Sequence, residues 1–150
     1  MILEITSEKK MKELGVHIGT FLLGGETVEL IGDVGAGKTT LVKGIAVGLG
    51  ITENVSSPSF MISRIYDGHD DIKLAHYDFY RLQDAGLMNE ELAETLLNSK
   101  MVTIIEWGGV VSEILPIDKL SIRINAKTED SRQVEIKAGG IISQELLNKL

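Results

Sequence analysis

One stretch of the chain has the residue types and spacing of a phosphate-binding loop. Residues 32–39, GDVGAGKT, match the pattern G-x-x-x-x-G-K-[ST] in full. Glycines let the backbone turn its N–H groups toward a phosphate and approach it closely. Lys38 would place a positive charge at the β- and γ-phosphate oxygens, and the Thr39 hydroxyl is suited to bind Mg²⁺. The alternative interpretation is a glycine-rich turn that binds no ligand.

The segments on either side of this phosphate loop favour the first interpretation. Residues 27–31 form a short, mostly apolar segment typical of a buried strand, and residues 38–49 have the pattern of a helix that Gly50 ends. A loop between them receives the positive end of the helix dipole in addition to free N–H groups. We therefore predict that a nucleotide contacts Asp33, Val34, Gly35, Ala36, Gly37, Lys38, Thr39 and Thr40.

Two carboxylates end predicted strands and could serve the same site. Glu106 directly follows the uncharged segment 101–105, and the carboxyl ends of such strands form the ligand-binding edge of an open α/β sheet. Glu106 is therefore the candidate for the carboxylate that holds the metal or its water. Asp78 ends the segment 72–78, where alternation puts it on one face with His76. That face could look toward the phosphates, although a polar face in water fits the pattern equally well.

Two further features lie close to these segments. Trp107 follows Glu106 and is the only tryptophan of the chain, for which packing in the core or at an interface is the simple explanation. Residues 56–60, SSPSF, come after the helix of the phosphate loop and before the next strand. P-loop proteins carry switch segments in this position that become ordered around the γ-phosphate and Mg²⁺. Ser59 is the candidate nucleotide contact in this segment.

Periodicity elsewhere predicts the elements that must hold these residues in place. Helices are expected at residues 7–22, with Thr6 or Ser7 as the cap, at 89–97 and at 143–150, and further strands at 61–66, 119–125 and 132–137. Helices that alternate with strands predict an α/β fold, with a mixed, mainly parallel sheet flanked by helices in three layers. No repeat or linker divides the chain, so we expect residues 1–150 to form a single P-loop NTPase-like domain.

Composition excludes several classes of function. The chain has 150 residues with 22 acidic and 15 basic side chains, and its net charge of −7 opposes unassisted binding to nucleic acid. It has no cysteine, which removes disulfides, cysteine-ligated zinc, iron–sulfur clusters and thiol nucleophiles. The sequence contains neither a recognisable secretory signal nor an apolar run approaching about 18 residues. We expect a cytoplasmic protein that does not enter a membrane and that reaches any nucleic acid through a partner.

Four motifs, GDVGAGKTT, SSPSF, HYDFYRL and IIEWG, follow one another in an order and spacing that resembles the bacterial TsaE (YjeE) family of P-loop ATPases. The resemblance covers most of the chain. Ser59 stands where that family usually has threonine, which keeps the hydroxyl and removes a methyl group. The resemblance implies a role in making threonylcarbamoyladenosine in tRNA, within a complex that contains the TsaB and TsaD proteins. The partners would contact the tRNA, and ATP hydrolysis would reset the complex between turnovers.

The resemblance also implies roles for individual residues. Lys38 and Thr39 hold phosphate and Mg²⁺, and Glu106 is a carboxylate on the metal side. Asp78 and Trp107 belong to the catalytic site. Two positions far apart in the sequence, Glu8 and Arg132, line the nucleotide in similar proteins.

These observations lead to one hypothesis and two alternatives. The hypothesis is a Mg²⁺-dependent ATPase, weak alone, that binds ATP and ADP and in which Asp78 orients or activates water. A small P-loop kinase that phosphorylates a metabolite is the first alternative, although no insertion long enough for an arginine-bearing lid follows the apolar strands. A nucleotide-gated binding module with negligible turnover is the second.

Overall fold

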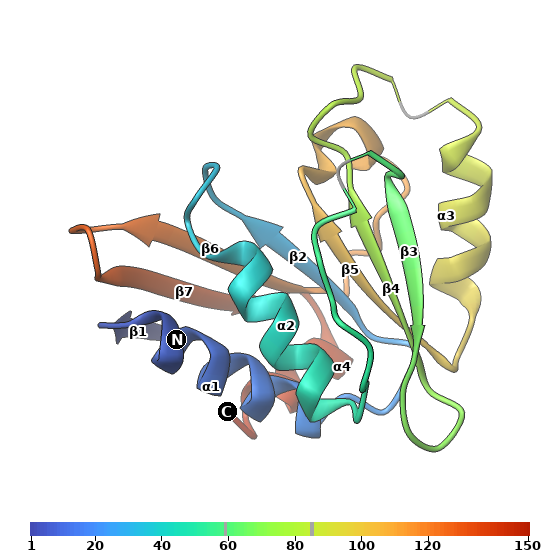
Figure 1. The fold of residues 1–150 in the computed structure, drawn as a ribbon. Coiled ribbons are helices and arrows are strands. Elements are labelled where there is room, and N and C mark those ends of the chain that lie inside the picture. Colours follow the sequence, from blue (N-terminus) through green and yellow to red (C-terminus); the bar gives the residue numbers. More distant parts are fainter. Residues whose placement is uncertain (59, 85) are drawn as a thin grey trace.

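The computed structural model describes residues 1–58, 60–84 and 86–150, and its elements alternate between strands and helices (Figure 1). In chain order they are β1 (Ile2–Ile5), α1 (Glu8–Thr20), β2 (Thr27–Ile31), α2 (Lys38–Gly48), β3 (Ser63–Asp67), β4 (Lys73–Asp78), α3 (Met88–Leu97), β5 (Met101–Glu106), the 3-10 turn η1 (Gly108–Val111), β6 (Leu120–Ala126), β7 (Arg132–Ala138) and α4 (Ile141–Leu147). This order confirms the predicted α/β fold.

The strands form one sheet with the order β1-β7-β6-β2-β5-β4-β3. The central neighbours β6, β2, β5 and β4 pair in parallel, whereas β1 with β7, β7 with β6 and β3 with β4 pair antiparallel. Five of the seven strands in the described ranges therefore run in one direction, and β7 and β3 run in the other. The sheet is mixed and mainly parallel, as the sequence predicts.

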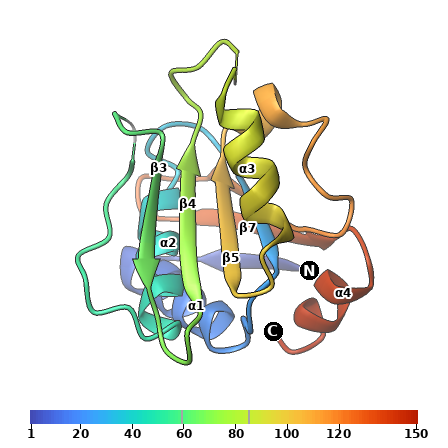
Figure 2. The same ribbon diagram turned by 90° about the vertical axis from the view of Figure 1, so that its right-hand side faces the viewer.

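Helices cover the sheet on both faces. α1 and α2 lie side by side on one face, and α3 covers the opposite face beside β4 and β5 (Figure 1 and Figure 2). Alternation divides the strand residues between two hydrophobic clusters: Leu74 and Ile104 belong to the cluster of α1 and α2, while Tyr77 and Ile105 belong to that of α3. α4 packs against β7 and β6, and its Leu146 joins the first cluster. The site-bearing strands β4 and β5 are therefore buried on both faces.

The contact between α1 and α2 is made by backbone rather than by side chains. Gly15 and Gly19 of α1 face Gly44 and Gly48 of α2. A Cβ added to Gly15 would collide with the Leu41 carbonyl, and one added to Gly44 would collide with a carbonyl of α1. Side chains cannot fit between the two helices, and this close approach brings the start of α1 next to the start of α2.

Two differences from the predicted elements concern β1 and β3. Ser7 is the cap of α1 and accepts a hydrogen bond from the N–H of Lys10, but the strand β1 before it was not predicted. β1 pairs with β7, a partner about 130 residues away that a local pattern cannot reveal. β3 begins later than predicted because Ile62 has a φ of 68° and its N–H donates a hydrogen bond to the Pro58 carbonyl, which closes a turn.

Within the described residues, no helix has the length and apolarity needed to cross a membrane.

Candidate active site

The phosphate loop joins the end of β2 to the start of α2 and has the backbone of an anion cradle. Gly35 and Gly37 have φ angles of 79° and 108°, which side-chain-bearing residues rarely adopt. The position of a Cβ at Gly35 has no atom within 4 Å, so the loop is open there. In the described part of the chain no side chain caps α2, and its first N–H groups have no intrahelical acceptor. These N–H groups suit the oxygens of a phosphate.

Lys38 is held across the mouth of this loop although its side chain is nearly buried. Its ammonium donates hydrogen bonds to the carbonyls of Gly32, at 2.7 Å, and Asp33, at 3.0 Å. The same nitrogen lies 4.9 Å from the centre of the Trp107 ring and 4.0 Å from Oε2 of Glu106. The positive charge is therefore already in position before any ligand supplies a negative one.

Asp78 and Glu106 lie at the carboxyl ends of the adjacent parallel strands β4 and β5, where they are partners in register. Asp78 is 6% exposed and Glu106 only 3%. Asp78 accepts hydrogen bonds of 3.0 Å from the Ser57 hydroxyl and from the N–H of Tyr80. The interpretation of this strand face as a polar surface in water is therefore wrong, because the face looks into the fold beside the phosphate loop.

His76 lies one alternation before Asp78 on β4 and is fully buried. Its Nε2 is 2.8 Å from Oε1 of Glu106. Sequence reasoning put His76 on the face of Asp78 but did not pair it with Glu106. The signal that could have found the pair is the parallel register of β4 and β5, which brings the two side chains to the same face of neighbouring strands.

Trp107 follows Glu106 with a φ of 56°, a left-handed conformation that turns the chain sharply at the end of β5. Its ring packs against Tyr80, with the ring centres 4.9 Å apart, as well as under the Lys38 ammonium. Packing alone is therefore an incomplete explanation of this tryptophan, because its ring forms one wall of the site. Arg81, beyond the same strand, lies over the ring of Phe60 at 4.5 Å.

These residues line a cavity of about 370 Å³ that we call the strand-end cavity. Its lining residues are Val34, Gly35, Gly37, Lys38, Thr39, Thr40, Ser57, Asp78, Tyr80, Arg81, Glu106 and Trp107. The structure thus brings the four predicted catalytic residues into one hollow together with the predicted metal-binding hydroxyl of Thr39. Ser59, the predicted contact in the preceding segment, lies outside the described residues.

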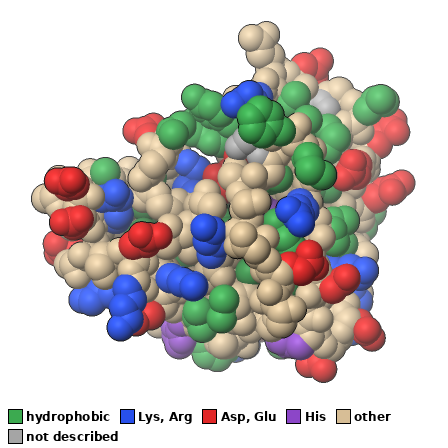
Figure 3. Space-filling model, viewed as in Figure 1, with side chains coloured by type: hydrophobic (Ala, Val, Ile, Leu, Met, Phe, Trp, Pro, Cys, Tyr) green, Lys and Arg blue, Asp and Glu red, His purple; other side chains and the backbone are tan. Residues whose placement is uncertain are grey.

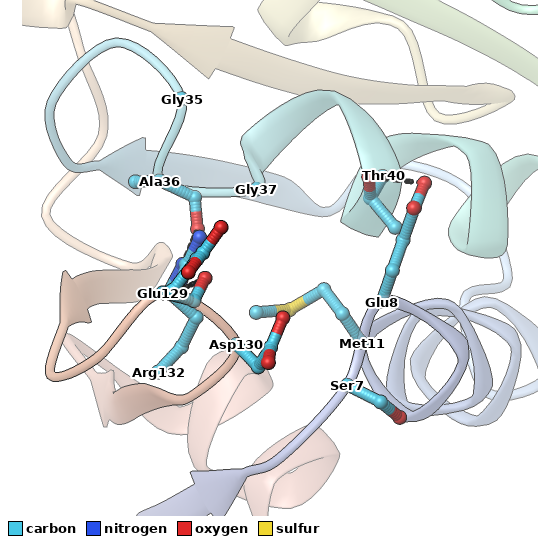
Figure 4. A pocket seen from close by; sticks show the side chains of 10 residues that line it. All are labelled: Ser7, Glu8, Met11, Gly35, Ala36, Gly37, Thr40, Glu129, Asp130 and Arg132. Carbon is cyan, nitrogen blue, oxygen red and sulfur yellow. Dashed lines mark hydrogen bonds between the residues drawn. The ribbon is translucent and has the colours of Figure 1, made fainter.

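A second cavity, of about 350 Å³, lies on the other side of the phosphate loop and is called here the helix-side cavity (Figure 4). It is lined by Ser7, Glu8, Met11, Gly35, Ala36, Gly37, Thr40, Glu129, Asp130 and Arg132. The two cavities share Gly35, Gly37 and Thr40, so a ligand that passes over the loop would reach both.

Glu8 and Arg132 line opposite sides of the helix-side cavity although 124 positions separate them in the sequence (Figure 4). Glu8 begins α1, and its Oε1 accepts a hydrogen bond of 3.4 Å from the Thr40 hydroxyl of α2. Nε of Arg132 donates to the Ala36 carbonyl at 3.1 Å, which ties the start of β7 to the phosphate loop. Sequence reasoning missed Glu129 and Asp130, because only the hairpin turn between β6 and β7 carries them to this cavity.

The lining of the strand-end cavity fits a magnesium–nucleotide complex. The loop offers uncapped N–H groups to phosphates, and the Thr39 hydroxyl shares the cavity with two buried carboxylates. The described residues contain no cluster of three or more His, Cys, Asp or Glu side chains able to hold a metal. Mg²⁺ keeps several waters and binds through few carboxylates together with substrate phosphates, so a sparse donor set of this kind suits it.

Apolar side chains surround the mouth of the strand-end cavity. Figure 3 shows a group of hydrophobic side chains in the upper part of the view, above the part of the surface that α1 and α2 form. Val34 and Tyr80, which line the cavity, are 71% and 54% exposed, and Phe60, which contacts the lining residue Arg81, is 85% exposed. Contiguous exposed apolar patches rimmed by polar residues often mark protein–protein interaction sites.

Comparisons with known proteins match the chain to one family and to a solved structure. A family model described as threonylcarbamoyl adenosine biosynthesis protein TsaE matches residues 5–134. A Streptomyces coelicolor protein named tRNA threonylcarbamoyladenosine biosynthesis protein TsaE is 38% identical over 122 residues, which are 81% of this chain and 82% of that protein. The Bacillus subtilis protein of the same name is 37% identical over 134 residues, covering 88% and 82%. The crystal structure of Bacillus subtilis YdiB matches with a TM-score of 0.82 at 31% identity, covering 99% of this chain and 92% of that one.

Proposed function

Because the chain belongs to the TsaE family of threonylcarbamoyl adenosine biosynthesis proteins, we propose that it is a Mg²⁺-dependent ATPase serving this modification of tRNA. It would act in a complex with TsaB and TsaD, which would contact the tRNA. The single observation that carries the ATPase proposal is the strand-end cavity. There, Lys38, Asp78 and Glu106 converge on the N-terminus of α2.

Each residue of this cavity has a role that follows from its position. The N–H groups of the phosphate loop bind the phosphate chain, and the fixed Lys38 ammonium neutralises charge that develops on the γ-phosphoryl oxygens. The Thr39 hydroxyl and the Glu106 carboxylate would hold Mg²⁺, which supplies a positive charge to the phosphate oxygens when bound. Asp78 is the second carboxylate at this edge and would orient the attacking water or accept its proton.

The helix-side cavity gives the remainder of the nucleotide a place to bind. An ATP whose phosphates lie in the loop would extend its ribose and base past Gly35 and Gly37 toward Glu8 and Arg132. Carboxylates such as Glu8 accept hydrogen bonds from ribose hydroxyls or from base amino groups. Arg132 would act mainly through the loop, since its guanidinium is bonded to the Ala36 carbonyl.

Two observations support a function that depends on partners. The net charge of −7 disfavours direct binding of the chain to tRNA, so a partner would carry the RNA. The exposed apolar side chains of Val34, Phe60 and Tyr80 lie next to the nucleotide site, where a partner surface could close it. Low turnover of the isolated chain follows, because an open cavity leaves the reacting phosphate in contact with bulk water.

The test is a calorimetric titration of Mg-ATP, Mg-ADP and Mg-GTP into the pure chain, repeated with TsaB and TsaD, while phosphate release is monitored. We expect adenine-selective binding and phosphate release that increases when both partners are present. Phosphate release without any acceptor distinguishes an ATPase from a metabolite kinase. Tight nucleotide binding with no response to the partners would overturn the pathway assignment. Partner affinity that follows the bound nucleotide without turnover would indicate a nucleotide-gated module instead.

A further inference from the structure

The buried pair of His76 and Glu106 is not explained by nucleotide binding alone. His76 is 0% exposed and does not line the strand-end cavity, so it has no direct access to a ligand there. Its Nε2 nevertheless lies 2.8 Å from Oε1 of Glu106. His76 is hydrogen-bonded to Glu106 and does not line the cavity. Any effect that it has on a bound ligand must therefore pass through Glu106.

The chemistry of the pair fixes where the proton lies. A carboxylate without a proton only accepts hydrogen bonds, so Nε2 must carry a hydrogen and donate a hydrogen bond to Oε1. Nδ1 of His76 is buried and has no hydrogen-bond partner among the described residues. A lone pair at that position costs less free energy than a buried N–H with no acceptor. The geometry therefore places the donating N–H of His76 at Nε2.

The same hydrogen bond fixes the orientation of the Glu106 carboxylate. With Oε1 held by His76, the second oxygen, Oε2, is directed toward Lys38, whose Nζ is 4.0 Å away. Without the histidine, the carboxylate could rotate about its last side-chain bond, a torsion with a broad energy minimum. Carboxylates that bind metals are commonly held by a hydrogen-bond partner behind them, and loss of that partner weakens metal binding.

We infer that His76 is a positioning residue that holds Oε1 of Glu106, so that Oε2 faces Lys38 and the side of the cavity where Mg²⁺ would bind. The inference rests on the proposed function for the identity of the metal, but the hydrogen bond itself is independent of it. Replacement of His76 should weaken the response to Mg²⁺ and leave the binding of metal-free nucleotide intact, because among the described residues the hydrogen bond of His76 goes to Glu106 and not to the phosphate loop.

The variants His76→Leu and His76→Gln separate positioning from folding. Leucine removes the donor, whereas the glutamine side chain can place an N–H close to the position of Nε2. For His76→Leu we expect a roughly 10- to 100-fold loss in turnover or in Mg²⁺ affinity. His76→Gln should recover a large part of that loss. In the presence of EDTA, the ATP affinity of both variants should equal that of the parent chain. The control His69→Gln alters an exposed histidine that is hydrogen-bonded to Asp70, and its ATP affinity should also equal that of the parent chain.

A second measurement does not depend on activity. Nitrogen-15 NMR of the parent chain reports the tautomer of each of its three histidines, and the signal that disappears in His76→Gln identifies His76. We expect a proton on Nε2, and a proton on Nδ1 alone would overturn the inference. Unchanged Mg²⁺ dependence in a folded His76→Leu variant would also overturn it, as would an equal loss of metal-free ATP affinity. Failure of the proposed function would appear differently, as a parent chain that binds no nucleotide.

Discussion

Asp78 and Glu106 are register partners at the ends of two parallel strands, yet each carboxylate is held by a different kind of group. The Ser57 hydroxyl and a backbone N–H bind Asp78, whereas an imidazole binds Glu106. The partners of Asp78 come from two connecting segments, the loop before β3 and the turn after β4. The partner of Glu106 comes from the centre of the sheet. Each proposed role therefore has its own support, connecting segments for the water-orienting Asp78 and a strand of the sheet for the metal-binding Glu106.

Asp78→Asn should separate binding from hydrolysis. The amide keeps the size of the side chain and loses the negative charge, so nucleotide affinity should remain while turnover falls by about 100-fold or more, the usual contribution of a general base. Phosphate release and calorimetric binding measure the two quantities. Asp84→Asn, which changes an exposed carboxylate after the same strand, serves as the control. A large loss of affinity in Asp78→Asn would move Asp78 from catalysis to binding.

Lys38→Ala should abolish turnover, since the variant loses the charge that the loop carbonyls hold at the phosphate position. Lys43→Ala changes an exposed lysine on the same helix and should hydrolyse ATP like the parent chain. Circular dichroism checks that both variants are folded. Hydrolysis at the parent rate by Lys38→Ala would contradict the assignment of this lysine to the γ-phosphate.

Arg132→Ala should weaken nucleotide binding without changing the rate of ATP hydrolysis once the nucleotide is bound. Its guanidinium joins the Ala36 carbonyl to the carbonyls of Thr128 and Glu129, so it fixes the helix-side cavity from both sides. We expect about a tenfold increase in Kd, which corresponds to about 1.4 kcal/mol. Arg123→Ala, on the neighbouring strand, is the matched control. Equal Kd values for the two variants would show that the contact does not shape the cavity.

Gly44→Ala should destabilise the fold more than its small size suggests. The added methyl group would meet the carbonyl of Lys12 and the backbone of Gly15, and overpacking of this kind costs about 1–3 kcal/mol. For a domain of this length each kcal/mol lowers Tm by roughly 2–4 °C. A Cβ at Gly109 has no atom within 4 Å, so Gly109→Ala is the control in thermal unfolding. Equal Tm values would mean that α1 and α2 can separate at little cost.

Asp118 should give the stability of the chain a component that disappears in acid. Hydrogen bonding from the Ser143 side chain, and then from the backbone N–H groups of Ser143 and Ile142 at the start of α4, lowers the pKa of Asp118 below 3.8. A lowered pKa in the folded state means that the stabilisation is present above the ordinary value and is lost as the pH falls through the lowered one.

The variant Asp118→Ala removes this capping interaction. At neutral pH it should unfold more easily than the parent chain by about 1 kcal/mol, the usual effect of a lost helix cap, and less if solvent screens the partly exposed carboxylate. The denaturation midpoints of the parent chain and of Asp118→Ala should converge as the pH falls below 3.8, the ordinary pKa of the carboxyl group. Glu145→Ala, an exposed carboxylate on the same helix, controls for a general change in charge. A difference between parent and Asp118→Ala that persists in acid would contradict the pKa argument.

Sequence reasoning predicts the local parts of this molecule well and its distant contacts poorly. The bounds of β2 and β5 agree with the predicted segments because each is a short, mostly apolar run, which is typical of a strand buried in a sheet. Alternation also predicts correctly that His76 and Asp78 share a face. The bond from His76 to Glu106 depends on which strands become neighbours, and no local pattern contains that information.

The helix-side cavity illustrates the same limit. Its walls come from the start of α1, the phosphate loop and the β6–β7 turn, three segments that only the complete fold brings together. Glu8 and Arg132 could be predicted through the family resemblance alone, while Glu129 and Asp130 had no sequence signal of their own. Trp107 is a different case, because its type suggested packing, whereas its left-handed backbone turns the ring under Lys38.

The phosphate loop separates two cavities whose charged side chains differ, and this bears on the design of inhibitors. Fragments for the strand-end cavity need an anionic group that matches the cradle and Lys38. Fragments for the helix-side cavity meet the carboxylates of Glu8, Glu129 and Asp130, which favour a cationic or hydrogen-bond-donating group. A compound that links the two fragments over Gly35 would carry a negative charge at one end and a positive charge at the other. Such a zwitterion would gain effective concentration at both cavities, and its selectivity would come from the order of its charges.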